Sequence, residues 1–210
     1  MFSFSFRSPA FSPSNAVLLF ALLLTACARQ PVSPPRPDKA ALWSAHSARL
    51  TAMHDWQFRG RIAVRLEKEA WSASLYWRET LDTYTLRVVA PLGRGTFELS
   101  GTVAGVEMRT ADNRILRAAD PETLMRDNLG WQLPVSGLRW WVRGLPRPGV
   151  KSEQLGVNAD GRLDNLIQDG WQVDYQEYRS KGNPVLPGKL SLENGPVRVR
   201  LLIGEWIMAP

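Results

Sequence analysis

The sequence of 210 residues combines 44% hydrophobic residues, including nine tryptophans, with a single cysteine. One cysteine excludes a disulfide within the chain, so a hydrophobic core must stabilise the fold, and the composition supplies the material for one. The formal net charge is +6, a basic balance that leaves nucleic acid, an anionic membrane surface or an acidic protein face as possible partners.

Residues 1–26 are predicted to be a signal peptide that is cut before Cys27. Arg7 supplies the basic region and Ala16–Leu24 the apolar region, and Leu24-Thr25-Ala26-Cys27 resembles a bacterial lipobox. The apolar run is well short of the roughly 20 residues that a membrane-spanning helix needs. Cleavage would free a cysteine that can carry acyl chains, and two or more chains hold a protein on a bilayer. The alternatives are an ordinary signal peptide with an incidental cysteine, or an uncleaved anchor.

Lipidation at Cys27 narrows the possible partners. A secreted lipoprotein meets no nucleic acid, and the loss of residues 1–26, in which Arg7 carries the one charge, lowers the net charge only to +5. In bacterial lipoproteins an Asp after the cysteine resembles an inner-membrane retention signal, but that residue is Ala28 here. We therefore expect a lipid-anchored protein of the outer membrane that faces the periplasm.

The rest of the chain is predicted to form a tether and one domain. Residues 27–37 are too rich in proline for a helix or a central strand and are typical of a semi-extended tether. Residues 38–210 have the length of one common domain. Apolar spacing after Asp38, placed as N-cap, predicts a first helix over 39–53.

Alternation of apolar and polar residues then predicts a long run of antiparallel strands. Two short helices, 121–130 and 135–143, interrupt this run. The first has Asp120 as N-cap and a proline at its first position. The predicted strands are 56–66, 71–78, 84–88, 96–100, 105–110, 114–118, 154–157, 163–168, 171–178, 189–192 and 197–206.

A sheet of about eleven strands with one apolar face must curl and close, or be covered by another element. The fold class is therefore mainly β, with about three helices. Rigid rings on the inward face suit a cavity that stays open, although alternating aromatics are also typical of a packed core. The candidate lining residues are Trp56, Phe58, Trp71, Trp77, Tyr84, Leu86, Trp171, Tyr175 and Trp206.

Six ordered segments carry a resemblance to a known family. They are Trp56-Gln-Phe-Arg-Gly-Arg-Ile-Ala63, Pro91-Leu-Gly93, Gly130-Trp-Gln-Leu-Pro134, Leu138-Arg-Trp-Trp-Val-Arg-Gly-Leu-Pro146, Gln168-Asp-Gly-Trp-Gln-Val-Asp-Tyr175 and Leu186-Pro-Gly-Lys-Leu-Ser-Leu192. In this order, after a lipobox, they resemble LolB, the outer-membrane lipoprotein family that receives other lipoproteins.

This resemblance implies an incomplete antiparallel β-barrel whose helices form a lid over a hydrophobic cavity. The cavity would accept acyl chains from lipoprotein cargo delivered by the periplasmic carrier LolA, and the cargo would then enter the inner leaflet of the outer membrane. We expect a monomer for such a receptor. The alternative, which the residues alone leave open, is a structural or assembly lipoprotein with a fully packed interior that binds protein partners.

The segment Ala90–Arg94 is predicted to be a turn that touches the membrane. Pro91 and Gly93 fix a tight bend, and Leu92 lies where a turn normally has a polar residue. The resemblance to LolB implies the same role, because this Pro-Leu-Gly is similar to the family's membrane-directed protrusion. Alternatively, Leu92 folds back over the mouth of the barrel.

Catalysis has little support in the sequence. His46 and His54 are too sparse for a metal site, and no Cys-x-x-Cys, phosphate-loop or Gly-x-Ser-x-Gly pattern occurs. We expect no enzyme, no cofactor and no metal. Arginines 59, 61 and 65 alternate with the apolar residues of the first strand and are either a solvated face or a surface for an acidic carrier.

Overall fold

The computed structural model describes residues 3, 38–91, 95–129, 132–180 and 184–208. The chain divides into two units, residues 1–36 and 37–210, and the fold below is that of the second. Cys27, the tether and the turn residues Leu92 and Gly93 therefore lie outside the described residues. No helix in the described part of the chain is long and apolar enough to cross a membrane.

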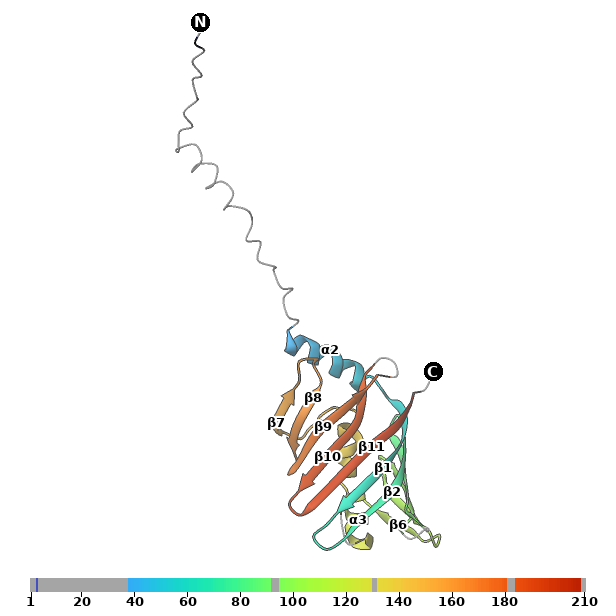
Figure 1. The fold of residues 1–210 in the computed structure, drawn as a ribbon. Helices are drawn as coiled ribbons and strands as arrows, with labels where there is room; N and C mark the ends of the chain where they lie inside the picture. The colour runs from blue at the N-terminus through green and yellow to red at the C-terminus, as the bar shows by residue number, and fades with distance from the viewer. Residues whose placement is uncertain (1–2, 4–37, 92–94, 130–131, 181–183, 209–210) are drawn as a thin grey trace. The chain divides into compact units, whose positions relative to one another are not determined.

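In the part of the chain that the structure describes, eleven antiparallel strands form one curved sheet, with three helices beside it (Figure 1). Neighbouring strands pair in the order β6-β5-β4-β3-β2-β1-β11-β10-β9-β8-β7. The helices are α2 (Lys39–Thr51), α3 (Pro121–Leu129) and α4 (Val135–Trp141). The strands are β1 (Asp55–Arg65), β2 (Ala70–Thr80), β3 (Thr83–Val89), β4 (Phe97–Thr102), β5 (Gly105–Thr110), β6 (Ile115–Ala118), β7 (Ser152–Val157), β8 (Leu163–Gln168), β9 (Trp171–Arg179), β10 (Leu186–Asn194) and β11 (Val197–Met208). The prediction of a mainly β fold with eleven strands and three helices is confirmed.

The sheet is not closed, because β6 and β7 are its two edges. The chain between them, residues 119–151, carries α3 and α4. Apolar side chains of both helices, such as Met125 and Leu138, belong to the same buried cluster as the inward residues of the strands. The connection between the edges thus covers the apolar face.

The predicted caps of α2 and α3 are confirmed. Asp38 accepts a hydrogen bond from the backbone N–H of Ala40 at 3.0 Å. Asp120 accepts one from the backbone N–H of Thr123 at 2.8 Å, and Pro121 is the first residue of α3. Each cap satisfies a backbone donor that the helix itself leaves free.

Two features of the long strands departed from the expectation. Strand β10 begins at Leu186, three residues earlier than predicted, because Pro187 pairs with Tyr178 at a register shift that tolerates the proline. In β11 the pairing jumps from Arg59–Glu205 to Gly60–Ile203, so one extra residue forms a bulge. A Cβ on Gly60 would lie 2.5 Å from the carbonyl oxygen of Leu202, and only glycine permits this approach.

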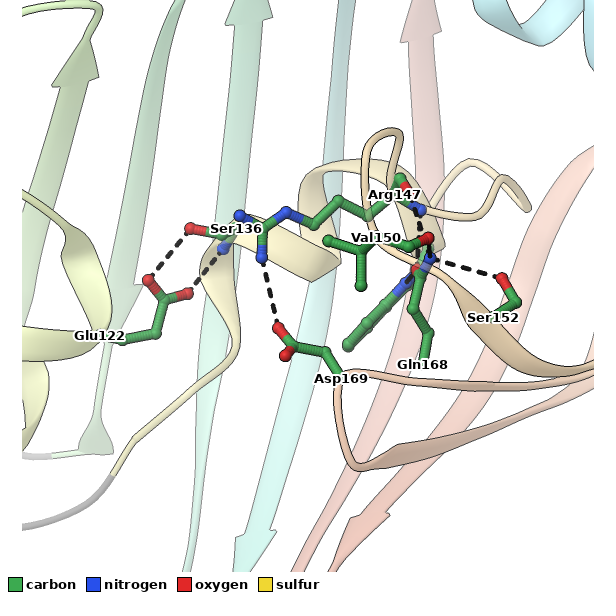
Figure 2. Close-up of polar contacts among 8 residues, drawn as sticks. Glu122, Ser136, Arg147, Val150, Ser152, Gln168 and Asp169 are labelled. Carbon is green, nitrogen blue, oxygen red and sulfur yellow. Dashed lines mark hydrogen bonds and ion pairs between the residues drawn. The ribbon is translucent and has the colours of Figure 1, made fainter.

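A buried amide fastens α4 and the loop after it to the sheet. The Gln168 side chain is completely buried at the end of β8. Its Oε1 accepts hydrogen bonds from Trp141 Nε1 at 2.9 Å and from the backbone N–H of Arg147 at 2.8 Å. Its Nε2 donates to the carbonyl oxygens of Arg147 and Val150 at 3.0 and 2.8 Å (Figure 2).

We predict that Gln168→Leu lowers the free energy of unfolding by about 3 to 5 kcal/mol, because several buried polar groups lose their partner at about 1 to 3 kcal/mol each. Chemical denaturation measures this loss. Gln172→Leu is the control, because Gln172 is exposed on the neighbouring strand and its replacement should change stability by less than about 0.5 kcal/mol. Equal, small effects of both substitutions would contradict the role given to Gln168.

Candidate functional site

Five of the predicted lining residues form one aromatic cluster across β11, β1, β2 and β3. Trp56 and Phe58 stack with ring centroids 6.2 Å apart, and Trp77 lies 5.9 and 6.0 Å from these two rings. Trp206 approaches Phe58 to 5.2 Å, and Tyr84 approaches Trp77 to 6.1 Å. The strand pairing explains this arrangement, because Phe58 is opposite both Trp77 and Trp206. The rings make one continuous apolar surface on the inner face.

The other four predicted residues make no ring contact with this cluster. Leu86 is fully buried on β3 directly opposite Trp77, and Trp171 and Tyr175 are buried on β9, across the curve of the sheet. Trp71 is half-buried at the beginning of β2. The alternation of residues predicted the inward face, while the strand pairing decides which of its residues meet.

Two donors within the aromatic surface are buried without a partner. Trp56 Nε1 and the Tyr84 hydroxyl make no hydrogen bond to any described residue, although Trp56 is 1% and Tyr84 6% exposed. Burial raises the pKa of Tyr84, so its hydroxyl remains protonated and able to donate. A buried, unsatisfied donor costs about 1 to 3 kcal/mol, and a polar atom of a bound molecule would remove that cost.

A buried carboxylate on the same face anchors α4. Glu79 is 6% exposed and accepts hydrogen bonds from Trp77 Nε1 at 3.3 Å and from Arg139 Nε at 2.9 Å. The Arg139 guanidinium also lies 4.9 Å from the centroid of the Tyr84 ring. Removing one partner of such a buried pair costs about 3 to 5 kcal/mol. The pair therefore fixes α4 over the aromatic surface.

Arg143 ties the end of α4 to the end of α2. Its guanidinium donates to the carbonyl oxygens of Leu50 and Met53 at 3.2 and 3.0 Å and lies over the rings of Trp56 and Trp140. Burial lowers the pKa of Arg143 to about 10, which leaves it charged near neutral pH. Sequence reasoning assigned no role to Glu79, Arg139 or Arg143.

Helix α3 is joined to its surroundings in a different way. Leu124 and Met125 are buried, but the polar contacts described between α3 and another element all involve Glu122. This carboxylate accepts hydrogen bonds from the Ser136 backbone N–H at 2.8 Å and from the Ser136 hydroxyl at 3.0 Å (Figure 2). The polar contacts of the cover thus join α4 to the sheet and α3 to α4, while the apolar side chains of α3 also pack against the sheet beside β5 and β6.

Several predicted residues are not brought into this site. Cys27, Leu92 and Gly93 lie outside the described residues, and Pro91 is exposed just after β3. Within the described ranges, no group of three or more His, Cys, Asp or Glu residues is placed to hold a metal ion. Among the described residues the interior is mainly apolar, and the buried side chains of Glu79, Arg143 and Gln168 are hydrogen-bonded within it.

Comparison with known proteins assigns the family. The family model described as outer membrane lipoprotein LolB matches residues 54–206. The outer-membrane lipoprotein LolB of Pseudomonas fluorescens is 40% identical over 195 residues, which are 91% of this chain and 94% of the relative. The chain belongs to the LolB family. A LolB of Pseudomonas putida is 42% identical over 164 residues, 78% of this chain and 80% of the relative.

The curved sheet of this LolB family member also resembles a solved structure. A LolA superfamily protein from Nitrosomonas europaea superposes with a TM-score of 0.53 over 81% of this chain and 94% of that protein. The sequence identity is 7%, so the likeness concerns the fold alone. It agrees with the open antiparallel sheet and the helices on its concave side.

We predict that Glu122→Ala loosens α3 and leaves α4 in place. Loss of the two contacts to Ser136 should cost about 1 to 2 kcal/mol, so amides of residues 121–129 should exchange with solvent roughly 5 to 30 times faster. Hydrogen exchange followed by mass spectrometry measures this, and exchange in residues 135–141 should stay unchanged. Asp127→Ala is the control, because Asp127 makes only a surface ion pair with Arg126 in the described structure. Equal acceleration in both helices would contradict a two-part cover.

Proposed function

We propose that this LolB family member is an outer-membrane lipoprotein that receives acylated lipoproteins from a LolA-type periplasmic carrier and passes them into the inner leaflet of the outer membrane. Cys27 is its lipid-anchored residue in this proposal. No bond is made or broken in the cargo. Acyl chains move by differences in affinity between the carrier, the receptor and the bilayer.

The observation that carries the proposal is the inner aromatic surface under a cover whose outer part, α3, has few polar contacts. Displacement of α3 would expose apolar area beside the cluster of Trp56, Phe58 and Trp77. Each acyl methylene that leaves water contributes about 0.8 kcal/mol, so a chain of about 15 methylenes gains on the order of 12 kcal/mol. The cost of displacing α3 includes roughly 1 to 2 kcal/mol for the Glu122 contacts and about 1.5 to 3 kcal/mol each for re-exposing the buried side chains of Leu124 and Met125. The gain from one acyl chain is larger than this combined cost.

The two unpartnered donors give the site a way to orient its cargo. The acyl chains of a lipoprotein end in ester or amide carbonyl groups, which accept hydrogen bonds. We assign Trp56 Nε1 and the Tyr84 hydroxyl to these carbonyl groups. In the unbound protein these two donors have no hydrogen-bond partner among the described residues. The cost of leaving them unpaired is consistent with a binding site, because binding proteins retain groups that are satisfied only in the complex.

For Tyr84→Phe we expect stability and binding to change in opposite directions. Removal of the unsatisfied hydroxyl should raise the free energy of unfolding by up to about 1 to 2 kcal/mol. Affinity for a fluorescent acyl ester should fall by roughly fivefold or more, as for a lost hydrogen bond of about 1 kcal/mol. Fluorescence titration and thermal unfolding of the Cys27→Ala chain measure the two effects.

Tyr175→Phe is the matched control for this pair of measurements. The Tyr175 hydroxyl donates to the Trp141 carbonyl oxygen at 3.0 Å, so its loss should lower stability and leave the affinity unchanged. If the unsubstituted protein bound no acyl ester saturably, the alternative of a packed interior with protein partners would stand instead. A Tyr84→Phe variant with unchanged affinity would exclude the hydroxyl from cargo binding.

Delivery into the membrane is assigned to Pro91, Leu92 and Gly93, with Leu92 entering the acyl region. Burying one leucine contributes roughly 1.5 to 3 kcal/mol, which biases an encounter without anchoring the protein. We predict that Leu92→Glu preserves folding and transfer of a labelled lipoprotein from carrier to receptor, but blocks its transfer into liposomes. Leu81→Glu, at an exposed leucine in the turn between β2 and β3, serves as control and should deliver normally. Unimpaired delivery by Leu92→Glu would refute this role.

A further inference from the structure

The outer face of the sheet has a hollow that the acyl-binding proposal does not use. It has a volume of about 440 Å³ and lies over β2, β1, β11 and β10. Most of its lining comes from side chains of the solvent-facing set rather than from the inner face. Its lining residues are Ala63, Val64, Arg65, Ala70, Trp71, Ser72, Ser191, Glu193, Arg198, Val199 and Arg200.

Small side chains create this hollow and arginines surround it. Ala63 pairs with Ser72 on one side and with Arg200 on the other, and Arg200 pairs in turn with Ser191. Small residues on β2, β1 and β10 leave the space above them free. A volume of this size lies within the range of about 300 to 1,000 Å³ that small-molecule sites occupy.

The register places positive charges against each other at the hollow. Arg65 is directly opposite Arg198, and Arg200 is the diagonal neighbour of Arg65. Like charges opposite each other in an antiparallel pair are destabilising. All three residues are exposed, and a bound anion would relieve their repulsion.

One carboxylate neutralises part of this charge. Glu193 Oε1 lies 3.6 Å from Arg198 Nε. Among the described residues, no acidic side chain makes an ion pair with Arg65 or Arg200, so two guanidinium groups at the hollow have no acidic partner there. By contrast, Arg59 on the same strand pairs with Glu205 at 3.8 Å.

We propose that this hollow binds the phosphate group of an anionic phospholipid. Guanidinium groups recognise phosphate through paired hydrogen bonds, and basic residues near an anionic membrane surface contribute about 1 kcal/mol each. An acidic protein fits less well, because a hollow enclosed by Arg65, Arg198 and Arg200 suits a single small anionic group rather than a broad complementary surface.

The position of the hollow also favours a lipid. A second hollow, of about 410 Å³, adjoins it at Ser72 and extends past Arg61 to Pro91. The two hollows together form a basic path on the outer face that leads to the end of β3. The choice of a membrane lipid rests on the proposed function in one respect, namely that the turn after Pro91 faces the bilayer.

The test uses the double variant Arg65→Gln/Arg200→Gln in the full chain with Cys27→Ala, so that no lipid anchor masks the interaction. The control is Arg78→Gln/Arg87→Gln, which removes the same charge from exposed outer-face positions on β2 and β3 outside the hollow. Sedimentation with phosphatidylcholine vesicles that contain phosphatidylglycerol measures binding. We expect the hollow variant to lose at least roughly tenfold more affinity than the control, because it loses charge-assisted hydrogen bonds as well as general attraction. Equal losses would overturn the proposal.

Soluble probes separate the possible sources of the anion. Dihexanoyl-phosphatidylglycerol, below the concentration at which it forms micelles, should raise the melting temperature of the unsubstituted protein and not that of the hollow variant. If inorganic phosphate gave the same rise at the same concentration, the ligand would be free phosphate and not a lipid. If an acidic peptide depended on Arg65 and Arg200 while phosphatidylglycerol did not, the hollow would be a protein-binding surface.

Two further measurements keep this inference separate from the acyl site. The hollow variant should bind the fluorescent acyl ester with unchanged affinity, because both arginines lie on the face opposite the aromatic cluster. In the absence of phosphate and at low salt, Arg65→Gln alone should unfold at a slightly higher temperature, because it removes the repulsion with Arg198. A lower melting temperature would contradict the account of the repulsion.

Discussion

An antiparallel sheet that is apolar on one face needs a cover, and the way this chain supplies one determines the rest of its structure. The sheet curves but does not close, and the segment between its two edge strands folds back as α3 and α4 over the inner face. In a closed barrel the first and last strands would pair with each other, and no gap between edge strands would lie beside such a segment. Here the cover and the gap have the same origin, because one segment joins the two edge strands and lies over the interior.

The buried polar groups on the inner face of the sheet are of two kinds: some form hydrogen bonds that attach the cover, and others form no hydrogen bond to a described residue. Glu79, Gln168 and Arg143 are satisfied, and each links α4 to a different part of the fold. Trp56 Nε1 and the Tyr84 hydroxyl are unsatisfied and lie within the aromatic surface. The first group fixes α4 over the interior, while the second has hydrogen-bonding capacity that no described residue uses. A core selected for stability alone would favour phenylalanine at position 84.

Much of this arrangement follows from local patterns in the sequence. Period-two alternation located the strands and their inward faces, and the side-chain chemistry of Asp38 and Asp120 located two helix starts. The pairing of Glu79 with Arg139 did not follow, although alternation places Glu79 inward with Trp77, because the partner lies 60 residues away. The bulge at Gly204 and the early start of β10 depend on the neighbouring strands. For the same reason, the sequence did not distinguish the five clustered rings from Trp71, which lies toward the other end of β2.

The two edge strands raise a separate question, because an unpaired edge invites another extended chain to add to the sheet. Strand β6 is only four residues long, from Ile115 to Ala118, which limits the number of backbone groups it presents. Strand β7 is longer, but its pairing with β8 shifts register twice, between Ser152 and Gln154 and between Gly156 and Val157. Such irregularity bends an edge away from the flat geometry that strand addition requires. The rims of the open barrel are therefore poor templates for β-aggregation, so the protein can remain open without assembling edge to edge.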